Sequence, residues 1–376
     1  MWHYLKFFNF YIAVLLGLSA IWLGGVYIIY GYLLYLAFYI LGDALLGDDV
    51  SQPPLLNQRL LRYMLYGALP ISITIYLSAL WLVLPLQSVI GQWITPFLPI
   101  FLVDARQNTT WWQVVIAIPF LGLMLGGVAT VVAHELVHKV GNPKAVIIGR
   151  WLLAFSFDVN FSIEHVYNHH TKVGTPDDPA TAPRGRNVYV HFVKAFIGTQ
   201  KAGWKIEKKR LTRKQLSILS WHNAFLRGWL MSALLLSLAY TLAGAFGALM
   251  FIAVGLSAKF TLEVVNYMEH YGLVRHPRQP VQPRHSWNSN RRVSCWTMFN
   301  LPRHSHHHAQ GAVPFEKLKA MPDSPEMISG YISTMAIALI PPLWFKLMDK
   351  KLAHWDAHYA NKEELEIIQR LQVSRT

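Results

Sequence analysis

The sequence of 376 residues contains a single cysteine, Cys295, and this scarcity excludes several kinds of site. One thiol cannot form a disulfide within the chain, and it cannot supply a four-cysteine iron site or a C-x2-C redox motif. Any electrons that the protein uses must therefore come from another chain or from a cofactor.

Charged residues are also scarce, because Asp, Glu, Lys and Arg together make up only 14% of the chain. Soluble domains carry about 25%. By contrast, 53% of this chain is hydrophobic, and several apolar runs approach the ~20 residues that cross a bilayer. These features predict a polytopic membrane protein.

Acidic residues are the rarer charged type: 20 Asp and Glu stand against 34 Lys and Arg, which gives a formal charge of +14. The basic residues lie in loops between apolar runs and match no nucleic-acid reader motif, so no nucleic-acid partner is predicted. Positively charged loops are instead typical of the cytoplasmic side of a membrane protein, where they meet anionic lipid.

We expect an all-α integral membrane protein of about six transmembrane helices in one domain, residues 1–376, with a cytoplasmic histidine-rich cap. The 35 residues from Phe7 to Leu41 form an apolar run that is too long for one straight crossing. Two spans broken near Gly24 and Gly25 are therefore predicted, with one tilted helix as the alternative. The expected spans are residues 7–24, 26–42, 63–86, 111–133, 229–247 and 249–266.

The loops place the polar regions of the chain on one side of the membrane. Residues 134–228 and 267–326 are expected to be cytoplasmic and catalytic, and both termini to be cytoplasmic at the inner membrane. The proline-containing apolar stretches 89–103 and 327–348 are expected to be interfacial or packed segments rather than crossings.

Histidines cluster in three motifs: HELVH at 134–138, EHVYNHH at 164–170 and HSHHH at 304–308. Residues three or four positions apart share one helical face, so each motif is expected to direct two imidazoles to one place. The second histidine of each adjacent pair lies about 100° further round the helix, where it can reach a second metal ion. The expected pairs are His134 with His138, His165 with His169, and His304 with His307 or His308.

A metal site is favoured over a polar loop network, because so many buried imidazoles would otherwise leave donors and acceptors unsatisfied. The HELVH motif alone is typical of zinc metalloproteases, with Glu135 as the base, but such a site leaves the other two motifs unexplained. A zinc transporter would place ionisable residues within its spans, whereas these motifs lie at span ends or in loops. The isolated histidines are expected to be ordinary polar residues: His3, His191, His222, His354 and His358.

The three motifs, in the patterns H-x3-H, H-x3-HH and H-x2-HH, resemble the histidine boxes of the membrane fatty acid desaturase and hydroxylase superfamily. A fourth block, NYMEHYGL at 266–273, is similar to the signature of integral-membrane alkane monooxygenases and their xylene monooxygenase relatives. The resemblance implies a non-haem di-iron oxygenase, with two iron ions (Fe2+/Fe3+), that inserts one atom of O2 into a methyl C–H bond.

The reaction that the resemblance implies is the terminal hydroxylation of an alkane to a primary alcohol. Alkylarene methyl hydroxylation and lipid desaturation or hydroxylation remain alternatives within the same chemistry. The implied partners are membrane lipid, an apolar substrate, O2, and a rubredoxin or ferredoxin-type electron carrier with its reductase. His306 stands where the family usually has Asp, and we expect it not to be a ligand. The implied metal ligands are His134, His138, His165, His169, His170, His270, His304, His307 and His308.

Carboxylates beside the motifs are expected to orient the ligands and to offset the charge of the ions, because histidine ligands are neutral. The candidates are Glu135, Glu164, Glu269, Asp177 and Asp178. A basic run is a candidate docking surface for an acidic electron carrier, with attraction to anionic lipid as the alternative. This run consists of Lys201, Lys205, Lys208, Lys209, Arg210, Arg213 and Lys214.

Overall fold

The structure, a computed structural model, describes residues 2–54 and 57–373. Within these ranges the chain forms helices joined by turns, and β pairing is limited to two isolated bridges. The prediction of an all-helical protein with several long apolar helices is confirmed. The chain forms two compact units.

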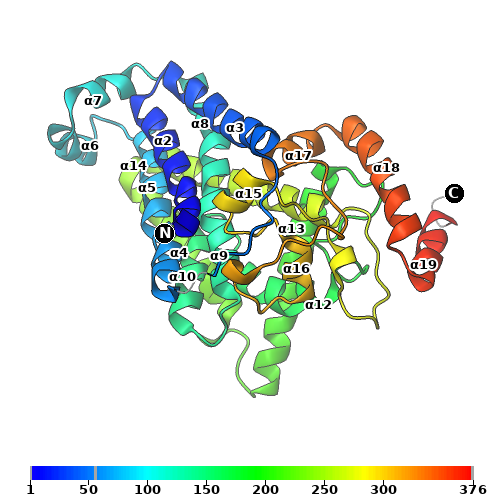
Figure 1. Cartoon of the computed structure of the whole chain (residues 1–376). Coiled ribbons are helices and arrows are strands. Elements are labelled where there is room, and N and C mark those ends of the chain that lie inside the picture. Colours follow the sequence, from blue (N-terminus) through cyan, green and yellow to red (C-terminus); the bar gives the residue numbers. More distant parts are fainter. Residues whose placement is uncertain (1, 55–56, 374–376) are drawn as a thin grey trace. The chain divides into compact units, whose positions relative to one another are not determined.

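The first unit comprises residues 2–38, 57–162 and 217–262. Helix α5 contacts both α2 and α8 in this unit, and α10 contacts α5 and α9 (Figure 1). Its elements are α1 (Trp2–Leu5), η1 (Lys6–Phe8), α2 (Asn9–Leu23), most of α3 (Val26–Leu46), α4 (Gln58–Tyr66), α5 (Ala68–Trp81), α6 (Val89–Ile94), η2 (Thr95–Phe97), α7 (Ile100–Gln107), α8 (Trp111–Leu125), η3 (Gly126–Thr130), α9 (Val131–Val137), α10 (Pro143–Ala154), the start of α11 (Phe161–Glu164) and most of α14 (Ala224–His270).

In the described part of the chain, five helical segments are long and apolar enough to cross a membrane, so the protein is a multi-pass membrane protein. A sixth would be the pair α17 (Tyr331–Ala338) and α18 (Pro341–His358), which is bent by 118°. The five segments are His3–Leu23, Val26–Leu46, Gln58–Trp81, Trp111–Val137 and Ala224–His270.

Glycines with positive φ interrupt the apolar runs. Gly24 (+64°) and Gly25 (+53°) separate α2 from α3, so the N-terminal run forms two helices. Helix α14 has 47 residues, and a straight helix of that length would measure about 70 Å, more than twice the ~30 Å hydrocarbon core. Its backbone leaves the helical conformation at Ala243 and Gly244, where φ is +63°. Glycine adopts this conformation without a Cβ clash.

A buried ion pair within the first unit joins α14 to the loop that follows α10. Lys259 Nζ lies 2.7 Å from Asp158 Oδ1, and the two side chains are only 1% and 3% exposed. A buried charge is costly unless it is paired, and removal of one partner typically costs about 3–5 kcal/mol.

We therefore expect Lys259→Met to lower the stability of the protein by about 3–5 kcal/mol, because it leaves the Asp158 carboxylate buried without its partner cation. The measurement is the apparent Tm of the purified protein in detergent. The double variant Lys259→Met/Asp158→Asn removes both charges and should regain part of the loss. A single variant with the wild-type Tm would contradict a stabilising role for the pair.

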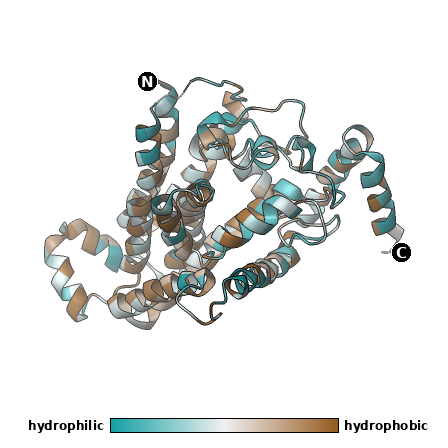
Figure 2. Cartoon of the chain, turned by 90° about the horizontal axis from the view of Figure 1, so that it is seen from below, coloured by the Kyte–Doolittle hydropathy of each residue, from teal (hydrophilic) through white to brown (hydrophobic). Residues whose placement is uncertain are grey.

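The second unit comprises residues 39–54, 163–216 and 263–373, and its C-terminal helix is polar: Figure 2 shows α19, beside the C label, largely in teal. The ends of α3, α11 and α14 also belong to this unit. Its other elements are η4 (His165–His169), α12 (His170–Lys172), α13 (Val188–Arg213), η5 (Pro283–His285), α15 (Arg292–Thr297), α16 (His304–Ala309), η6 (Phe315–Lys317), α17, α18 and α19 (Lys362–Val373).

Arg303 fixes the start of α16, the short helix that carries the third histidine motif. Its side chain is 2% exposed, and its guanidinium donates to the backbone oxygens of Leu318 at 2.6 Å and of Asp49 at 2.7 Å. Each acceptor lies on a different loop of the second unit. The position of α16 is therefore determined by contacts that are distant in sequence.

Candidate metal centre

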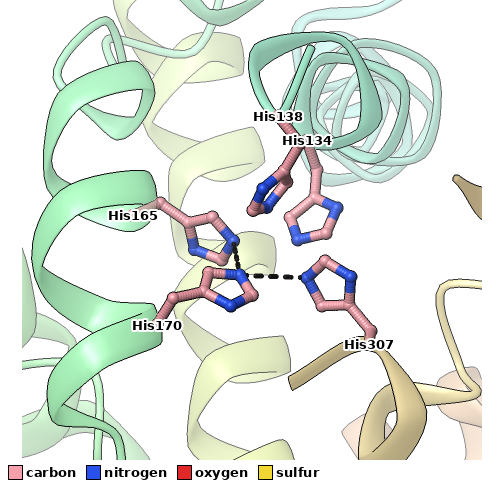
Figure 3. A group of neighbouring side chains, drawn as sticks. All are labelled: His134, His138, His165, His170 and His307. Atoms are coloured by element: carbon pink, nitrogen blue, oxygen red, sulfur yellow. Dashed lines mark hydrogen bonds between the residues drawn. The ribbon is translucent and has the colours of Figure 1, made fainter. Parts of the chain in front are cut away.

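The first histidine motif lies on α9, directly after the π-helix η3. His134 on this helix and His138 at its C-cap are four positions apart, and their ring centroids are 5.0 Å apart. Figure 3 shows the two imidazoles side by side. Glu135 forms an ion pair with Lys139 at 3.0 Å across one helical turn. This segment therefore offers two adjacent imidazoles from the first unit.

The second motif folds into a π-helix, η4, followed by α12. A π-helix has i→i+5 hydrogen bonds, so residues five positions apart come into register. His165 and His170 accordingly share one face, and their Nε2 atoms are 3.0 Å apart (Figure 3). The α-helical spacing predicts His169 as the partner of His165. Because this segment is a π-helix, His170 instead joins His165 in one group of candidate ligands.

His307 completes a group of three in the second unit. Its Nε2 atom lies 3.1 Å from the Nε2 atom of His170, and Figure 3 shows these rings turned toward each other. Ring nitrogens at these separations are close enough to bind one metal ion together. The spacing of His165, His170 and His307 thus fits adjacent ligands of one metal ion.

A second group of candidate ligands also lies in the second unit. The Nε2 atoms of His270 and His304 are 3.1 Å apart, and His304 Nε2 lies 3.3 Å from a carboxylate oxygen of Glu269. Within each of two overlapping sets, the candidate ligand atoms lie within 4.8 Å of one another. One set is His169, His270 and His308, and the other is Glu269, His270 and His304.

Hydrogen bonds at Nδ1 orient two of these imidazoles. His169 Nδ1 lies 2.9 Å from Asp178 Oδ2, and His270 Nδ1 lies 3.3 Å from the backbone oxygen of His285. A carbonyl oxygen and an ionised carboxylate only accept, so each Nδ1 donates and each Nε2 keeps its lone pair. Metal-ligating histidines are usually held in this way.

Asp178 is in the ionised form that this contact requires. Its side chain is fully buried. Burial raises the pKa of the carboxyl group, but the interactions with His169 and Thr181 outweigh burial and hold the pKa below its ordinary value. The carboxylate therefore places a negative charge directly behind a candidate ligand.

Two further carboxylates are buried beside the histidines. Glu269, which is 2% exposed, accepts a hydrogen bond of 2.7 Å from the Tyr331 hydroxyl. Glu164, which is 3% exposed, accepts a hydrogen bond of 2.9 Å from Asn168 Nδ2. Burial, followed by the charge of Asp178, raises the pKa of Glu164 to about 7. Cations nearby would favour the charged form of both groups.

The donor set fits metal ions. The Nε2 atom of His169 and both ring nitrogens of His308 are buried and lack hydrogen-bond partners within the part of the chain that the structure describes. Buried polar atoms of this kind are costly unless something else binds them. Burial and the surrounding histidines lower the pKa of His308 well below its ordinary value, so the ring is neutral, which is the form that binds metal.

The two aspartates behind the second motif differ in environment. The Asp177 side chain is 78% exposed and lies 3.8 Å from Lys172, so it faces solvent, whereas Asp178 is buried. His306 is buried as well, but its Nδ1 accepts a hydrogen bond of 3.1 Å from the backbone N–H of Lys319. Among residues 2–54 and 57–373, His306 belongs to none of the groups that could hold a metal ion.

The basic run occupies the C-terminal half of α13 and its C-cap, Lys214. Arg210 is half-buried and donates to Glu207 at 2.8 Å. The remaining members are exposed: Lys201, Lys205, Lys208, Lys209, Arg213 and Lys214.

Sequence patterns did not identify Tyr331 or His285 as parts of the site. Tyr331 lies 62 positions from Glu269, and His285 contacts His270 through its backbone oxygen, which no residue type reveals. Neither residue belongs to a histidine motif. Their contacts with the site are therefore evident only from the tertiary structure.

Comparisons with known proteins agree with this site. Residues 109–327, more than half of the chain, match the family model described as fatty acid desaturase. The Alkane 1-monooxygenase of Acinetobacter baylyi is 37% identical over 254 residues, which are 65% of this chain and 60% of that protein. The Alkane 1-monooxygenase of Pseudomonas putida is 30% identical over 359 residues, 90% of this chain and 82% of that protein.

A third relative is the xylene/toluene monooxygenase hydroxylase component XylM of Pseudomonas putida, which is 35% identical over 246 residues, 65% of this chain and 66% of that protein. The chain thus spans less than two thirds of the Acinetobacter relative and of XylM, but most of the Pseudomonas putida alkane 1-monooxygenase. The family model and that long alignment together identify the chain as a member of the fatty acid desaturase family.

Proposed function

We propose that the protein is a membrane-bound di-iron monooxygenase that hydroxylates the terminal methyl group of alkanes to primary alcohols. The observation that carries this proposal is the convergence of buried imidazoles in two groups, with ring nitrogens 3.0 to 3.1 Å apart. The relatives named alkane 1-monooxygenase support the choice of reaction.

The proposed ligands of the two iron ions are the nine histidines of the motifs and of the NYMEHYGL block. Iron, unlike redox-inert zinc, supplies the electron-transfer chemistry by which O2 is activated. The protein supplies neutral ligands and fixes their orientation through Asp178 and the backbone of His285. Within the second unit, we assign His165, His170 and His307 to one ion and the remaining ligands to the other ion. The remaining ligands are His169, His270, His304 and His308.

The proposed substrate is apolar and dissolves in the hydrocarbon layer, from which it enters the protein laterally. A methylarene is the second candidate, because the chain is also 35% identical to a xylene/toluene monooxygenase component. Both substrates require the same attack on a methyl C–H bond. The choice between them therefore depends on the shape of the apolar pocket that binds the substrate.

The proposed electron donor is a rubredoxin or ferredoxin-type carrier, because the single buried Cys295 cannot form a redox centre in this chain. We further propose that the protein lies in the inner membrane, with the metal centre and both termini in the cytoplasm. The basic loops support this orientation.

We expect charge reversal on α13 to slow reduction by an acidic carrier. The variant Lys201→Glu/Lys205→Glu/Lys208→Glu should reduce the rate at low ionic strength by about 10-fold or more and weaken its dependence on salt. The measurement is stopped-flow reduction of the iron-loaded protein by reduced rubredoxin at several salt concentrations. Lys346→Glu/Lys350→Glu, which reverses two exposed lysines of α18, is the matched control. Unchanged rates and salt dependence in the α13 variant would mean that this surface meets lipid headgroups instead.

The proposed function is tested by measuring the metal content of the purified protein together with its products. The assay offers octane and p-xylene side by side, with O2 and a reduced rubredoxin system. About two irons per chain with 1-octanol formed is the expected result. Two irons with only the methylarene oxidised would transfer the proposal to the second candidate. Zinc in place of iron, with no oxygenation after iron reconstitution, would overturn it.

A further inference from the structure

The C-terminal helix α19 begins with a capping box that uses a buried glutamate. Asn361 Oδ1 accepts from the backbone N–H of Glu364, and Glu364 Oε2 accepts from the backbone N–H of Asn361, both at 2.9 Å. A capping glutamate at the start of a surface helix is ordinarily exposed, but the side chain of Glu364 is 0% exposed. Its carboxylate therefore has a further role inside the protein.

That role is a contact with His285, which is also fully buried. Glu364 Oε1 lies 2.7 Å from His285 Nε2. The other ring nitrogen of His285 accepts from the backbone N–H of Gln282 at 3.0 Å, so Nε2 carries the proton and donates to the carboxylate. Arg284 donates to the same oxygen at 3.1 Å.

The protonation states agree with this arrangement. Burial raises the pKa of Glu364, but the hydrogen bonds from His285 and Arg284 outweigh burial, and the net pKa is lowered. Burial, together with the charges of Arg284 and Arg275, lowers the pKa of His285 by more than Glu364 raises it. An ionised carboxylate thus accepts from a neutral imidazole.

The backbone of His285 links this contact to the metal centre. Its carbonyl oxygen accepts from Nδ1 of the candidate ligand His270. The same short segment, η5, is held from α18 by Trp355, whose Nε1 donates to the backbone oxygen of Arg284 at 2.7 Å. The carbonyl that orients His270 is therefore held in place by side chains of α18 and α19.

We propose that Glu364 is a positioning residue for the metal ligand His270, and that it acts through His285. This inference rests on the proposed di-iron function. It gives the C-terminal helix, which lies outside the histidine motifs, a role in the geometry and retention of one metal ion. The chain of contacts runs from the Glu364 carboxylate to the His285 ring, and from the His285 carbonyl to the His270 ring.

The test compares three variants of the full-length, iron-loaded protein. In Glu364→Ala, we expect one of the two irons to be released to a chelator about 10-fold faster, at the lower end of the effect of losing a group that orients a ligand. The Mössbauer quadrupole splitting of that iron alone should change. Glu364→Gln keeps one acceptor oxygen for His285 but loses the acceptor of the capping box, so it should accelerate iron release less than Glu364→Ala does. Glu366→Gln alters an exposed glutamate on the same helix and is the matched control.

A second route tests the same chain of contacts without changing α19. His285→Phe should reproduce the faster iron release of Glu364→Ala, and the double variant should be no faster than either single variant. Wild-type release rates and spectra in both single variants would overturn the inference while leaving the di-iron proposal standing. Equal acceleration of both irons would reduce the role of Glu364 to general stability. Failure of the wild-type protein to bind iron would overturn the proposed function as well.

Discussion

Replacing His308 by alanine is expected to remove one iron ion from the purified protein and to lower hydroxylation by at least about 100-fold. Loss of a group that merely orients a ligand costs about 10–100-fold, and loss of the ligand itself should cost more. His308 is buried, and its ring centroid lies 4.5 Å from that of His304 and 4.6 Å from that of His270. Iron analysis and product formation measure the two effects separately.

The neighbouring His306 provides a matched control on the same short helix. Its Nδ1 accepts from the Lys319 backbone, and His306→Ala should cost about 1 kcal/mol of stability for that lost hydrogen bond. We expect this variant to keep both ions and to retain activity within about 3-fold. If His306→Ala loses iron as His308→Ala does, the proposed ligand set is wrong.

The sequence predicted much of the helical framework because the determinants are local. Long apolar runs set the helices, and two adjacent glycines mark the break between α2 and α3, since positive φ is cheap only for glycine. The break in α14 at Gly244 has the same physical origin. Helix packing and the bend between α17 and α18 depend on tertiary contacts, which the periodicity of apolar residues in the sequence does not predict.

The set of candidate ligands was also predictable, whereas their division into groups was not. Spacing on an α-helix joins His165 to His169, but η4 is a π-helix and joins His165 to His170. A π-turn inserts one residue into the helical register without leaving a trace in the pattern of apolar and polar residues. The helix type therefore decides which imidazole serves which group.

Residues that support the ligands through the tertiary fold could be proposed only where they adjoin a motif. Asp177 and Asp178 look equivalent in sequence, yet only Asp178 turns inward to contact His169. Tyr331 and Glu364 reach the site from 62 and 79 positions away along the chain, counted from Glu269 and His285. Their side chains become significant only when the fold brings them to a buried carboxylate or imidazole.

The difference between the two aspartates leads to the second large expected effect. Asp178→Asn keeps the size of the side chain but removes its charge, and it replaces one acceptor oxygen by a donor. In the native protein this carboxylate accepts from His169 at 2.9 Å, from Thr181 Oγ1 at 2.6 Å and from the Ala180 backbone at 3.1 Å. We expect about 10–100-fold weaker binding of one iron ion and a similar fall in turnover.

Iron titration of the apo-protein, together with turnover on octane, measures this effect. Asp177→Asn is the control, because it changes the same residue type one position earlier on an exposed side chain and should leave both quantities unchanged. If Asp178→Asn matches wild type in both iron affinity and turnover, the Asp178 carboxylate serves only the local turn through Thr181 and Ala180. If the iron is bound normally but turnover falls, the charge behind His169 acts on the reactivity of the ion rather than on its retention.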